Sequence, residues 1–258
     1  MCGRYANYHS TDAVVRAFGI DRIAESFEPS WNIAPTQRVA IIRDDDGPHP
    51  PQDGVASVAR LRELGVARWG LVPSWAKVLA DAPLLINARS ETVTTKPAFR
   101  AAASRRRTIV PASGYYEWQA QGRGPKTPFF LAPQDGAAIG FAGLYEWWRP
   151  ASAAGTPEGE DGQDWLCSVA IITRAANDTL GHIHDRMPVV VPQDLVDAWL
   201  DPTLTDRGEV GALVGAMPPP ALVPREVSRE VNSVRHNSAA LIRPVGPQGE
   251  QMRSSTEG

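Results

Sequence analysis

The chain has 258 residues, of which 43% are hydrophobic and 21% charged, and its formal net charge is −3. This composition is typical of a globular protein, and it lacks the overall basic excess that would by itself indicate a nucleic-acid partner. No apolar run of about 18 residues and no signal peptide is present, so we expect a cytoplasmic protein without a membrane partner. Two cysteines, Cys2 and Cys167, are too few for a disulfide framework or a cysteine-rich zinc site.

The first residues carry an unusual chemical possibility. If Met1 is removed, which a small second residue permits, Cys2 carries both a free α-amine and a thiol. The amine condenses with an aldehyde to a Schiff base, and the thiol then closes a five-membered thiazolidine ring. The α-amine has a pKa of about 7.7–8.0, so part of it is unprotonated at neutral pH. Taken alone, Cys2 is equally consistent with a chance cysteine in a frayed tail.

Periodicity and turn residues predict the elements that follow. Residues 11–18 form a short helix that ends at Gly19, and residues 31–35 form an irregular stretch. Exposed or mobile loops are expected at 44–53 and 150–164, and residues 223–234 are expected to be mainly extended. Further helices are predicted at residues 174–181, 192–200 and 205–217. Strands are predicted at residues 38–43, 108–114, 115–119, 129–131, 138–148 and 165–173, with Cys167 an inert buried residue in the last of them.

A basic segment interrupts this acidic chain. Residues 60–107 contain ten Lys or Arg residues against three acids, with Trp69, Trp75 and Phe99 among them. Cations that follow phosphates and rings that stack on bases are typical of a groove for single-stranded nucleic acid. A solvated charged face with tryptophans in the core explains the same composition equally well.

Two later stretches contain candidate acid–base groups. In the strand predicted at 115–119, Glu117 shares a face with Tyr115 and Gln119. It is either an exposed member of the strand or a partly buried acid with a raised pKa. His182 and His184 follow in a loop that ends at Pro188. Their spacing could chelate a metal on a strand, but no third ligand is in view, so we expect no metal and instead an acid–base role for a loop histidine.

Several of these stretches together resemble the SOS-response-associated peptidase (SRAP) family. The resemblance runs in order from residue 2 to about residue 245. The matching stretches are Cys2-Gly3-Arg4, Asn32-Ile-Ala-Pro35, Trp69-Gly-Leu-Val-Pro-Ser-Trp-Ala-Lys77, Asn87-Ala-Arg-Ser-Glu-Thr92, Pro97-Ala-Phe-Arg100, residues 106–118, His184-Asp-Arg-Met-Pro188 and Val227-Ser-Arg-Glu-Val-Asn232.

The resemblance implies an α+β fold, with a mostly antiparallel, barrel-like β core and peripheral helices. We expect one domain at residues 1–246, a disordered tail at 247–258, a monomer and no cofactor. The implied activity is abasic-site processing in the DNA damage response. The protein would bind single-stranded DNA that contains abasic sites, act at the nucleoid, and crosslink the ring-opened sugar aldehyde through Cys2. The resemblance names no protein partner at the replication fork.

The resemblance also assigns roles to individual residues. Cys2 is the nucleophile, Asn87 holds the ring or sugar, Glu117 exchanges protons with the amine and imine, and His184 assists opening of the sugar. Arg4 and Arg89 are similar to the family's phosphate ligands. Trp69 and Trp75 match its base-contacting or strand-bending aromatics. The complete set of DNA-binding residues that the resemblance implies is Arg4, Pro35, Trp69, Trp75, Arg89, Trp118 and Thr173.

Two alternatives remain open. Cys2 could serve as the N-terminal nucleophile of a thiol peptidase or autopeptidase, with His184 or the α-amine as its base. The chain could instead be a non-covalent single-stranded DNA module in which Cys2 is incidental. The chain also departs from the family pattern at Thr108, where many relatives have a cysteine and where we expect packing. A second departure is the acidic insertion at 150–164, which we expect to lie away from DNA.

Overall fold

A computed structural model describes residues 2–44, 61–120, 122, 124–150, 165–176 and 182–245. Most of the loop expected at 44–53, the insertion at 150–164 and the tail at 247–258 lie outside these residues. No helix in the described part of the chain is long and apolar enough to cross a membrane.

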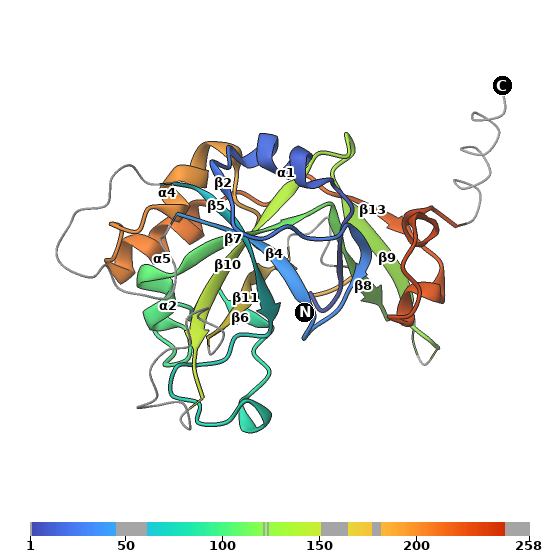
Figure 1. Ribbon diagram of the computed structural model, residues 1–258. Coiled ribbons are helices and arrows are strands. Elements are labelled where there is room, and N and C mark those ends of the chain that lie inside the picture. Colours follow the sequence, from blue (N-terminus) through green and yellow to red (C-terminus); the bar gives the residue numbers. More distant parts are fainter. Residues whose placement is uncertain are drawn as a thin grey trace.

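A closed barrel of five strands forms the centre of the fold (Figure 1). Around the ring the order is β5 (Glu63–Trp69), β4 (Arg38–Arg43), β7 (Arg107–Ala112), β10 (Ile139–Trp148) and β11 (Leu166–Ala175). Neighbours pair in the antiparallel sense, except that β11 and β5 pair in parallel and so close the ring. The barrel-like antiparallel core expected from the sequence is therefore confirmed.

A second sheet of five strands lies beside the barrel (Figure 1). Its order is β13 (Val223–Glu226), β9 (Thr127–Ala132), β8 (Gly114–Gln119), β1 (Tyr5–Asn7) and β3 (Ser30–Ile33). The N-terminal strand β1 is thus an interior member, with β8 on one side and β3 on the other. A terminus fixed in this way is ordered, unlike the frayed ends of most chains.

Three short strands complete the sheets. They are β2 (Arg22–Ile23), β6 (Asn87–Arg89) and β12 (Arg186–Pro188). Both β6 and β12 pair with β11, β6 in the parallel and β12 in the antiparallel sense. Strand β11 therefore brings together two stretches, at residues 87–89 and 186–188, that are far apart in the sequence.

The helices are short and peripheral, and α2, α4 and α5 gather on one side of the barrel (Figure 1). Helix α1 has the predicted bounds because Ser10 accepts a hydrogen bond from the Ala13 amide and Gly19 ends the helix with a φ of 63°. The α-helices are α1 (Thr11–Phe18), α2 (Arg100–Arg105), α4 (Val196–Leu200) and α5 (Arg207–Ala216). The 3₁₀ helices are η1 (Leu79–Asp81), η3 (Gln193–Leu195), η4 (Arg229–Asn232) and η5 (Ala239–Ile242).

Four local predictions were wrong, each because tertiary pairing overrides local pattern. Residues 30–33 form strand β3 on β1, where an irregular stretch was expected. Residues 174–175 continue β11, where a helix was expected, because they pair with β12. That pairing also makes residues 186–188 a strand and not a loop. Residues 229–232 form a 3₁₀ turn inside the stretch expected to be extended.

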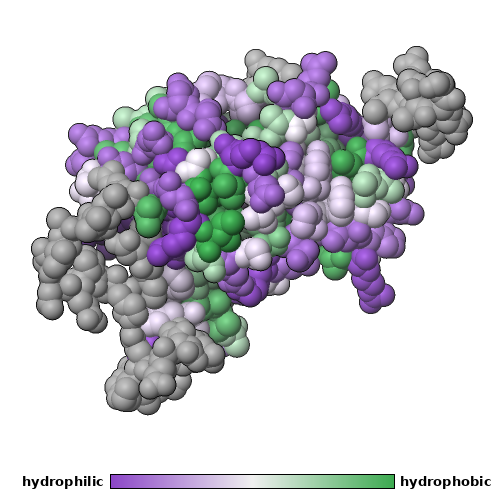
Figure 2. Space-filling model, turned by 45° about the horizontal axis from the view of Figure 1, so that its top comes forward, coloured by the Kyte–Doolittle hydropathy of each residue, from purple (hydrophilic) through white to green (hydrophobic). Residues whose placement is uncertain are grey.

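Alternate residues of the barrel strands face two different cores. In β4, Ala40 and Ile42 pack in a core that includes helix residues, whereas Val39 and Ile41 pack in one that includes residues of the second sheet. Cys2 belongs to this second core. The protein surface seen in Figure 2 is mostly hydrophilic and is interrupted by a few apolar patches.

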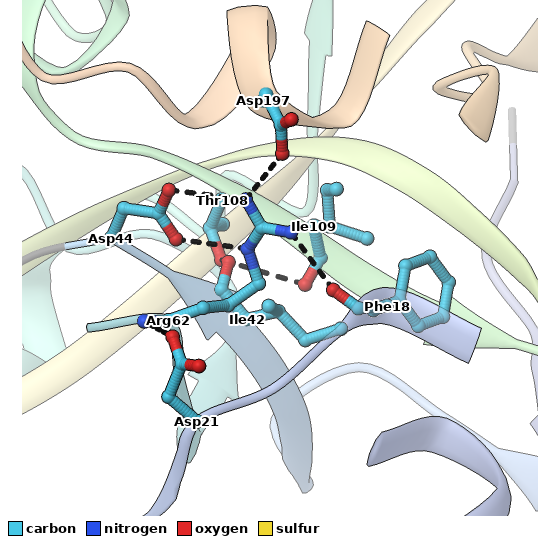
Figure 3. Close-up of polar contacts among 8 residues, drawn as sticks. All are labelled: Phe18, Asp21, Ile42, Asp44, Arg62, Thr108, Ile109 and Asp197. Atoms are coloured by element: carbon cyan, nitrogen blue, oxygen red, sulfur yellow. Dashed lines mark hydrogen bonds and ion pairs between the residues drawn. The ribbon is translucent and has the colours of Figure 1, made fainter. Parts of the chain in front are cut away.

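Part of the basic excess in residues 60–107 is used inside the fold. The Arg62 guanidinium binds both carboxylate oxygens of Asp44, one oxygen of Asp197 and the carbonyl of Phe18, while its backbone amide donates to Asp21 (Figure 3). Arg106 pairs with Glu146 at 2.7 Å. These arginines tie loops and helices to the barrel, so only the remainder of the basic segment is available to a ligand.

The departure at Thr108 is a packed position, as predicted. Thr108 is fully buried, and its hydroxyl donates to the carbonyl of Ile42 at 2.7 Å (Figure 3). Its own carbonyl accepts the indole N–H of Trp199 at 2.8 Å. Cys167 is likewise buried in β11, in line with the prediction.

Candidate active site at the N-terminus

Cys2 lies in a fixed and fully buried position just before β1. The backbone that follows it is held by β8, where the Tyr116 amide donates to the carbonyl of Arg4 at 2.9 Å. Its own carbonyl accepts a hydrogen bond of 2.9 Å from the side-chain amide of Asn87, the first residue of β6. Strands from both sheets therefore position the N-terminal cysteine.

The surroundings of the Cys2 thiol favour its neutral form. Burial raises the pKa of the thiol far above its usual value, and the nearby negative charge of Glu117 raises it further, while a backbone hydrogen bond from Arg4 partly opposes these effects. The same site raises the pKa of the Tyr115 hydroxyl, mainly through burial and then through the charges of Cys2 and Glu117. The thiol is thus protonated at neutral pH in this arrangement.

Glu117 is a buried carboxylate, with 4% of its surface exposed. The predicted alternation along β8 is confirmed, since Tyr115 packs in the core that holds Cys2 whereas Tyr116 packs in a separate core with Phe130. Glu117 therefore points to the Cys2 side of the sheet. Of the two readings of this acid left open by the sequence, the structure supports the buried one.

His184 reaches the same region from the loop before β12. Ile183 and Met187, which flank it, pack in the core that includes Cys2, and Gln119 of β8 donates to the carbonyl of His182 at 3.1 Å. His184 Nδ1 lies 3.0 Å from the Arg186 amide and 2.8 Å from the Asp185 carboxylate. The first contact suits the neutral ring, with its proton on Nε2, and the second suits the protonated ring.

Asn87 has one amide atom satisfied and one unsatisfied. Its Nδ2 group donates to Cys2, but Oδ1 is buried and accepts no hydrogen bond from any described residue. Unsatisfied buried acceptors are rare in folded proteins and commonly mark a ligand position. Two residues further along β6, the side chain of Arg89 is exposed.

A hydrogen-bonded network supports β6 and the histidine loop from behind. Arg186 donates to both carboxylate oxygens of Glu91, at 2.6 and 3.0 Å, and to the carbonyl of Thr173 at 2.6 Å. The Arg186 hydrogen bonds lower the pKa of Glu91 to about 2. Thr173 itself is buried, and its hydroxyl lies 3.5 Å from the carbonyl of Ala88. Thr173 therefore lies beneath β6 and does not face solvent.

The two tryptophans expected to contact bases differ in exposure. Trp69 is fully buried, with its ring edge-on to Tyr5 and its indole N–H bonded to the carbonyl of Ile86 at 3.0 Å. In this conformation it offers no surface to a base and instead supports β1 and the segment that leads to Asn87. Trp75 is 61% exposed and lines a cavity of about 350 Å³ with Lys77.

The remaining DNA-binding candidates lie near the N-terminus and on the second sheet. Pro35 is partly exposed in the turn between β3 and β4. Arg4 is half-buried, and its guanidinium carbon lies 5.9 Å from the ring centroid of Trp118, which is also partly exposed. The structure thus gathers Cys2, Asn87, Glu117 and His184 at one site, with Arg4 beside Cys2.

Several residues of this site received no role from the sequence. Glu91, Arg186 and Asn32 support the site through side-chain hydrogen bonds, and all three lie inside stretches that carried the family resemblance. Membership in those stretches was the only signal available for them. Among the described residues no three His, Cys, Asp or Glu side chains gather as metal ligands.

Comparison with known proteins agrees with this architecture. A solved structure from Bacteroides thetaiotaomicron shares the fold, with a TM-score of 0.76 at 22% identity over 95% of this chain and 100% of its own. The chain is 36% identical to the abasic site processing protein YoaM of Bacillus subtilis, over 94% of this chain and 97% of that one. It is 31% identical to the abasic site processing protein YedK of Escherichia coli, over 95% of this chain and 100% of that one. The family model described as SOS response associated peptidase (SRAP) matches residues 1–234, and the chain belongs to that family.

Proposed function

We propose that this protein processes abasic sites by forming a covalent crosslink between Cys2 and single-stranded DNA. The ring-opened abasic sugar is an aldehyde, and a free N-terminal cysteine is a 1,2-aminothiol that traps aldehydes as a thiazolidine. Two relatives that match over nearly their whole length are named abasic site processing proteins. The proposed product is a thiazolidine that joins the protein to the strand and shields the lesion.

The observation that carries the proposal is the arrangement around Cys2. The residue is held through its carbonyl by Asn87, faces the buried Glu117 carboxylate, and lies beside the unsatisfied Asn87 Oδ1 atom. A sugar hydroxyl or the nitrogen that reacts with the sugar would donate a hydrogen bond to that oxygen. A nucleophile fixed in this way gains the rate advantage of proximity and orientation.

The electrostatics of the site favour an order of steps in which the amine acts first. The raised pKa of the Cys2 thiol keeps the sulfur protonated, whereas an α-amine ordinarily has a pKa of about 7.7–8.0. The unprotonated amine adds to the aldehyde carbon, and loss of one water gives the imine. The sulfur then bonds to the imine carbon, and the thiol proton passes to the nitrogen, so that the net reaction releases one water.

Glu117 and His184 are the groups suited to the proton transfers. The Glu117 carboxylate accepts the proton that the amine must lose and returns it during dehydration, which requires both protonation states of a buried acid. His184 has contacts suited to its neutral and its protonated form, at Arg186 and Asp185. It would donate a proton to the ring oxygen of the sugar as the ring opens.

The proposed path of the strand uses the exposed parts of the basic segment. Arg89 lies two residues from Asn87 on β6, so its guanidinium can bind a phosphate close to the reacting sugar. Trp75 and Lys77 lie on the loop between β5 and β6, where an exposed ring and a cation suit a base and a phosphate. Trp69 would act from within the core.

The decisive experiment compares two versions of the protein that differ only in the position of a tag. With a C-terminal tag and Met1 removed, incubation with single-stranded DNA that carries one abasic site should give a heat-stable adduct. Its intact mass should equal protein plus DNA minus one water. With an N-terminal tag the Cys2 nitrogen is an amide and cannot form an imine, so no stable adduct should appear.

The two outcomes separate the candidate functions. Equal adduct from both versions would rule out the thiazolidine and point to a nucleophile elsewhere in the chain. Binding without any adduct from either version would favour the non-covalent module. Cleavage of a peptide substrate that depends on Cys2, with no adduct, would favour the thiol peptidase. The N-terminus of each preparation is verified by mass spectrometry before incubation.

A further inference from the structure

Two stretches that carry the family resemblance, residues 32–35 and 227–232, have no role in the mechanism above, yet they meet at Arg4. Asn32 of β3 is buried, and its Oδ1 accepts a hydrogen bond of 2.7 Å from Arg4 Nη1. Its Nδ2 group donates to the carbonyls of Ser233 and His236, at 3.0 and 2.7 Å. Asn32 thus connects Arg4 to the turn that follows η4, which lies beside β8 and β9 (Figure 1).

These contacts determine which side of the Arg4 guanidinium is available. Nη1 donates both to Asn32 Oδ1 and to the carbonyl of Val231, each at 2.7 Å, so its two protons are used. Nε is buried without an acceptor among the described residues. The Nη2 group therefore remains to bind a ligand.

The charge of Arg4 also remains. Its partners in the described part of the chain are a neutral amide and a backbone carbonyl, and no carboxylate there forms an ion pair with it. A half-buried cation held only by neutral acceptors keeps its full attraction for an anion. A phosphate group satisfies this requirement.

The same C-terminal turn holds the neighbouring aromatic ring. Asn232, the last residue of η4, accepts the indole N–H of Trp118 through Oδ1 at 2.7 Å. The Arg4 guanidinium carbon lies 5.9 Å from the centroid of that ring, within range of a cation–π contact. Residues 231 and 232 therefore fix Arg4 and Trp118 together, one through its backbone and the other through its side chain.

We propose that Arg4 and Trp118 form one nucleotide-binding platform, and that Asn32 and Asn232 are its positioning residues. The Nη2 group of Arg4 takes a phosphate, and the ring of Trp118 takes the face of an adjacent base in a single DNA strand. Stacking of this kind tolerates any base sequence. This inference rests on the proposed function, because it assigns DNA as the ligand of the site beside Cys2.

The test uses Asn232→Leu, which removes the acceptor for the indole N–H. Asn232 is exposed, so the variant should fold, and thermal melting checks that it does. We expect affinity for intact single-stranded DNA, measured by fluorescence anisotropy, to fall about 2- to 10-fold, the range for one neutral hydrogen bond. The crosslinking rate at saturating abasic DNA should stay unchanged, since Asn232 does not touch the reacting groups.

A double-mutant cycle distinguishes positioning from general stabilisation. Trp118→Phe removes the N–H that Asn232 accepts, so adding Asn232→Leu to it should weaken DNA binding no further. Asn237→Leu is the matched control, because Asn237 lies in the same segment but accepts hydrogen bonds from Ser30 and Trp31, away from the platform. Its DNA affinity should match that of the wild type.

Asn32→Asp tests the other end of the platform. An aspartate would still accept from Arg4 but would neutralise its charge, so binding should weaken and the slope of log affinity against log salt should flatten by about 0.7, the value for one phosphate on a single strand. Wild-type affinity in Asn232→Leu, or an undiminished effect of that change in Trp118→Phe, would overturn the inference. Since affinity is read on intact DNA, this result stands apart from the proposed function, which fails only if wild-type protein gives no adduct.

Discussion

The side chain of Asn87 donates a hydrogen bond of 2.9 Å to the backbone carbonyl of Cys2, and so joins β6 of the barrel to the start of the chain. Because β6 pairs with β11 in the barrel and β1 pairs with β8 in the second sheet, this bond crosses from one sheet to the other. The position of the N-terminal cysteine is therefore a property of the whole fold.

Asn87→Ala should remove both this hydrogen bond and the unsatisfied acceptor Oδ1. Loss of one neutral hydrogen bond is worth about 0.5–1.5 kcal/mol, which predicts a crosslinking rate lower by roughly 2- to 10-fold or more if the acceptor also binds substrate. Single-turnover kinetics on abasic single-stranded DNA measures it. A rate equal to that of the wild type would show that Cys2 is held without Asn87.

Cys2→Ala should abolish the heat-stable adduct while leaving the fold and the affinity for intact DNA unchanged. The remaining α-amine can still form an imine, which only reduction with borohydride makes permanent. Cys167→Ala is the control, since that thiol is buried in β11 and should not contribute. A heat-stable adduct from Cys2→Ala that disappears in the double variant would assign the nucleophile to Cys167 instead.

Glu117→Gln and His184→Ala should each slow crosslinking by roughly 10²–10⁴-fold, the range for loss of a general acid or base. Glu117→Gln should also change the pH dependence. The negative charge of Glu117 favours the protonated amine, so its removal should move the midpoint of the rate–pH profile to lower pH. Rates within twofold of the wild type for both variants would reduce these residues to structural roles.

Arg89→Ala should lower the affinity for single-stranded DNA of any sequence. If its exposed guanidinium binds one phosphate, the slope of log affinity against log salt should flatten by about 0.7. Arg207→Ala, a change of the same charge on an exposed position of α5, should leave the slope unchanged. An identical slope in Arg89→Ala and wild type would remove Arg89 from the DNA path.

Glu91→Gln should destabilise the protein in a way that depends on pH. Arg186 lowers the pKa of Glu91 to about 2 in the folded state, so the pair stabilises the fold above the unfolded pKa of about 4.5 and loses this effect as the pH falls toward 2. Because half of the Glu91 side chain is exposed, we expect less than about 1 kcal/mol at pH 7.

Urea unfolding of Glu91→Gln and wild type at several pH values checks this expectation. Glu28→Gln, at an exposed glutamate, controls for the loss of a surface charge. A difference in the free energy of unfolding between Glu91→Gln and wild type that stays constant from pH 7 to pH 2 would contradict the role of the Arg186 pair.

Local pattern in the sequence was sufficient for the elements that local physics controls. Residues 11–18 form the predicted helix because a serine cap and a glycine end act within one turn. The alternation that placed Glu117 with Tyr115 held because side chains of any strand alternate. The ordered motifs also predicted the family and the barrel-like fold.

Only the tertiary structure decided how the separate motifs are used. Nothing in the local sequence of residues 186–188 distinguishes a loop from a strand, and the pairing with β11 settles it. Burial likewise separates Trp69, which packs in the core, from Trp75, which is exposed, although both lie in one motif. The Asn32 contact with Arg4 spans 28 residues and that of Asn232 with Trp118 spans 114. Such pairs form only when the sheets are assembled, because their energy depends on distance in space and not on separation along the chain.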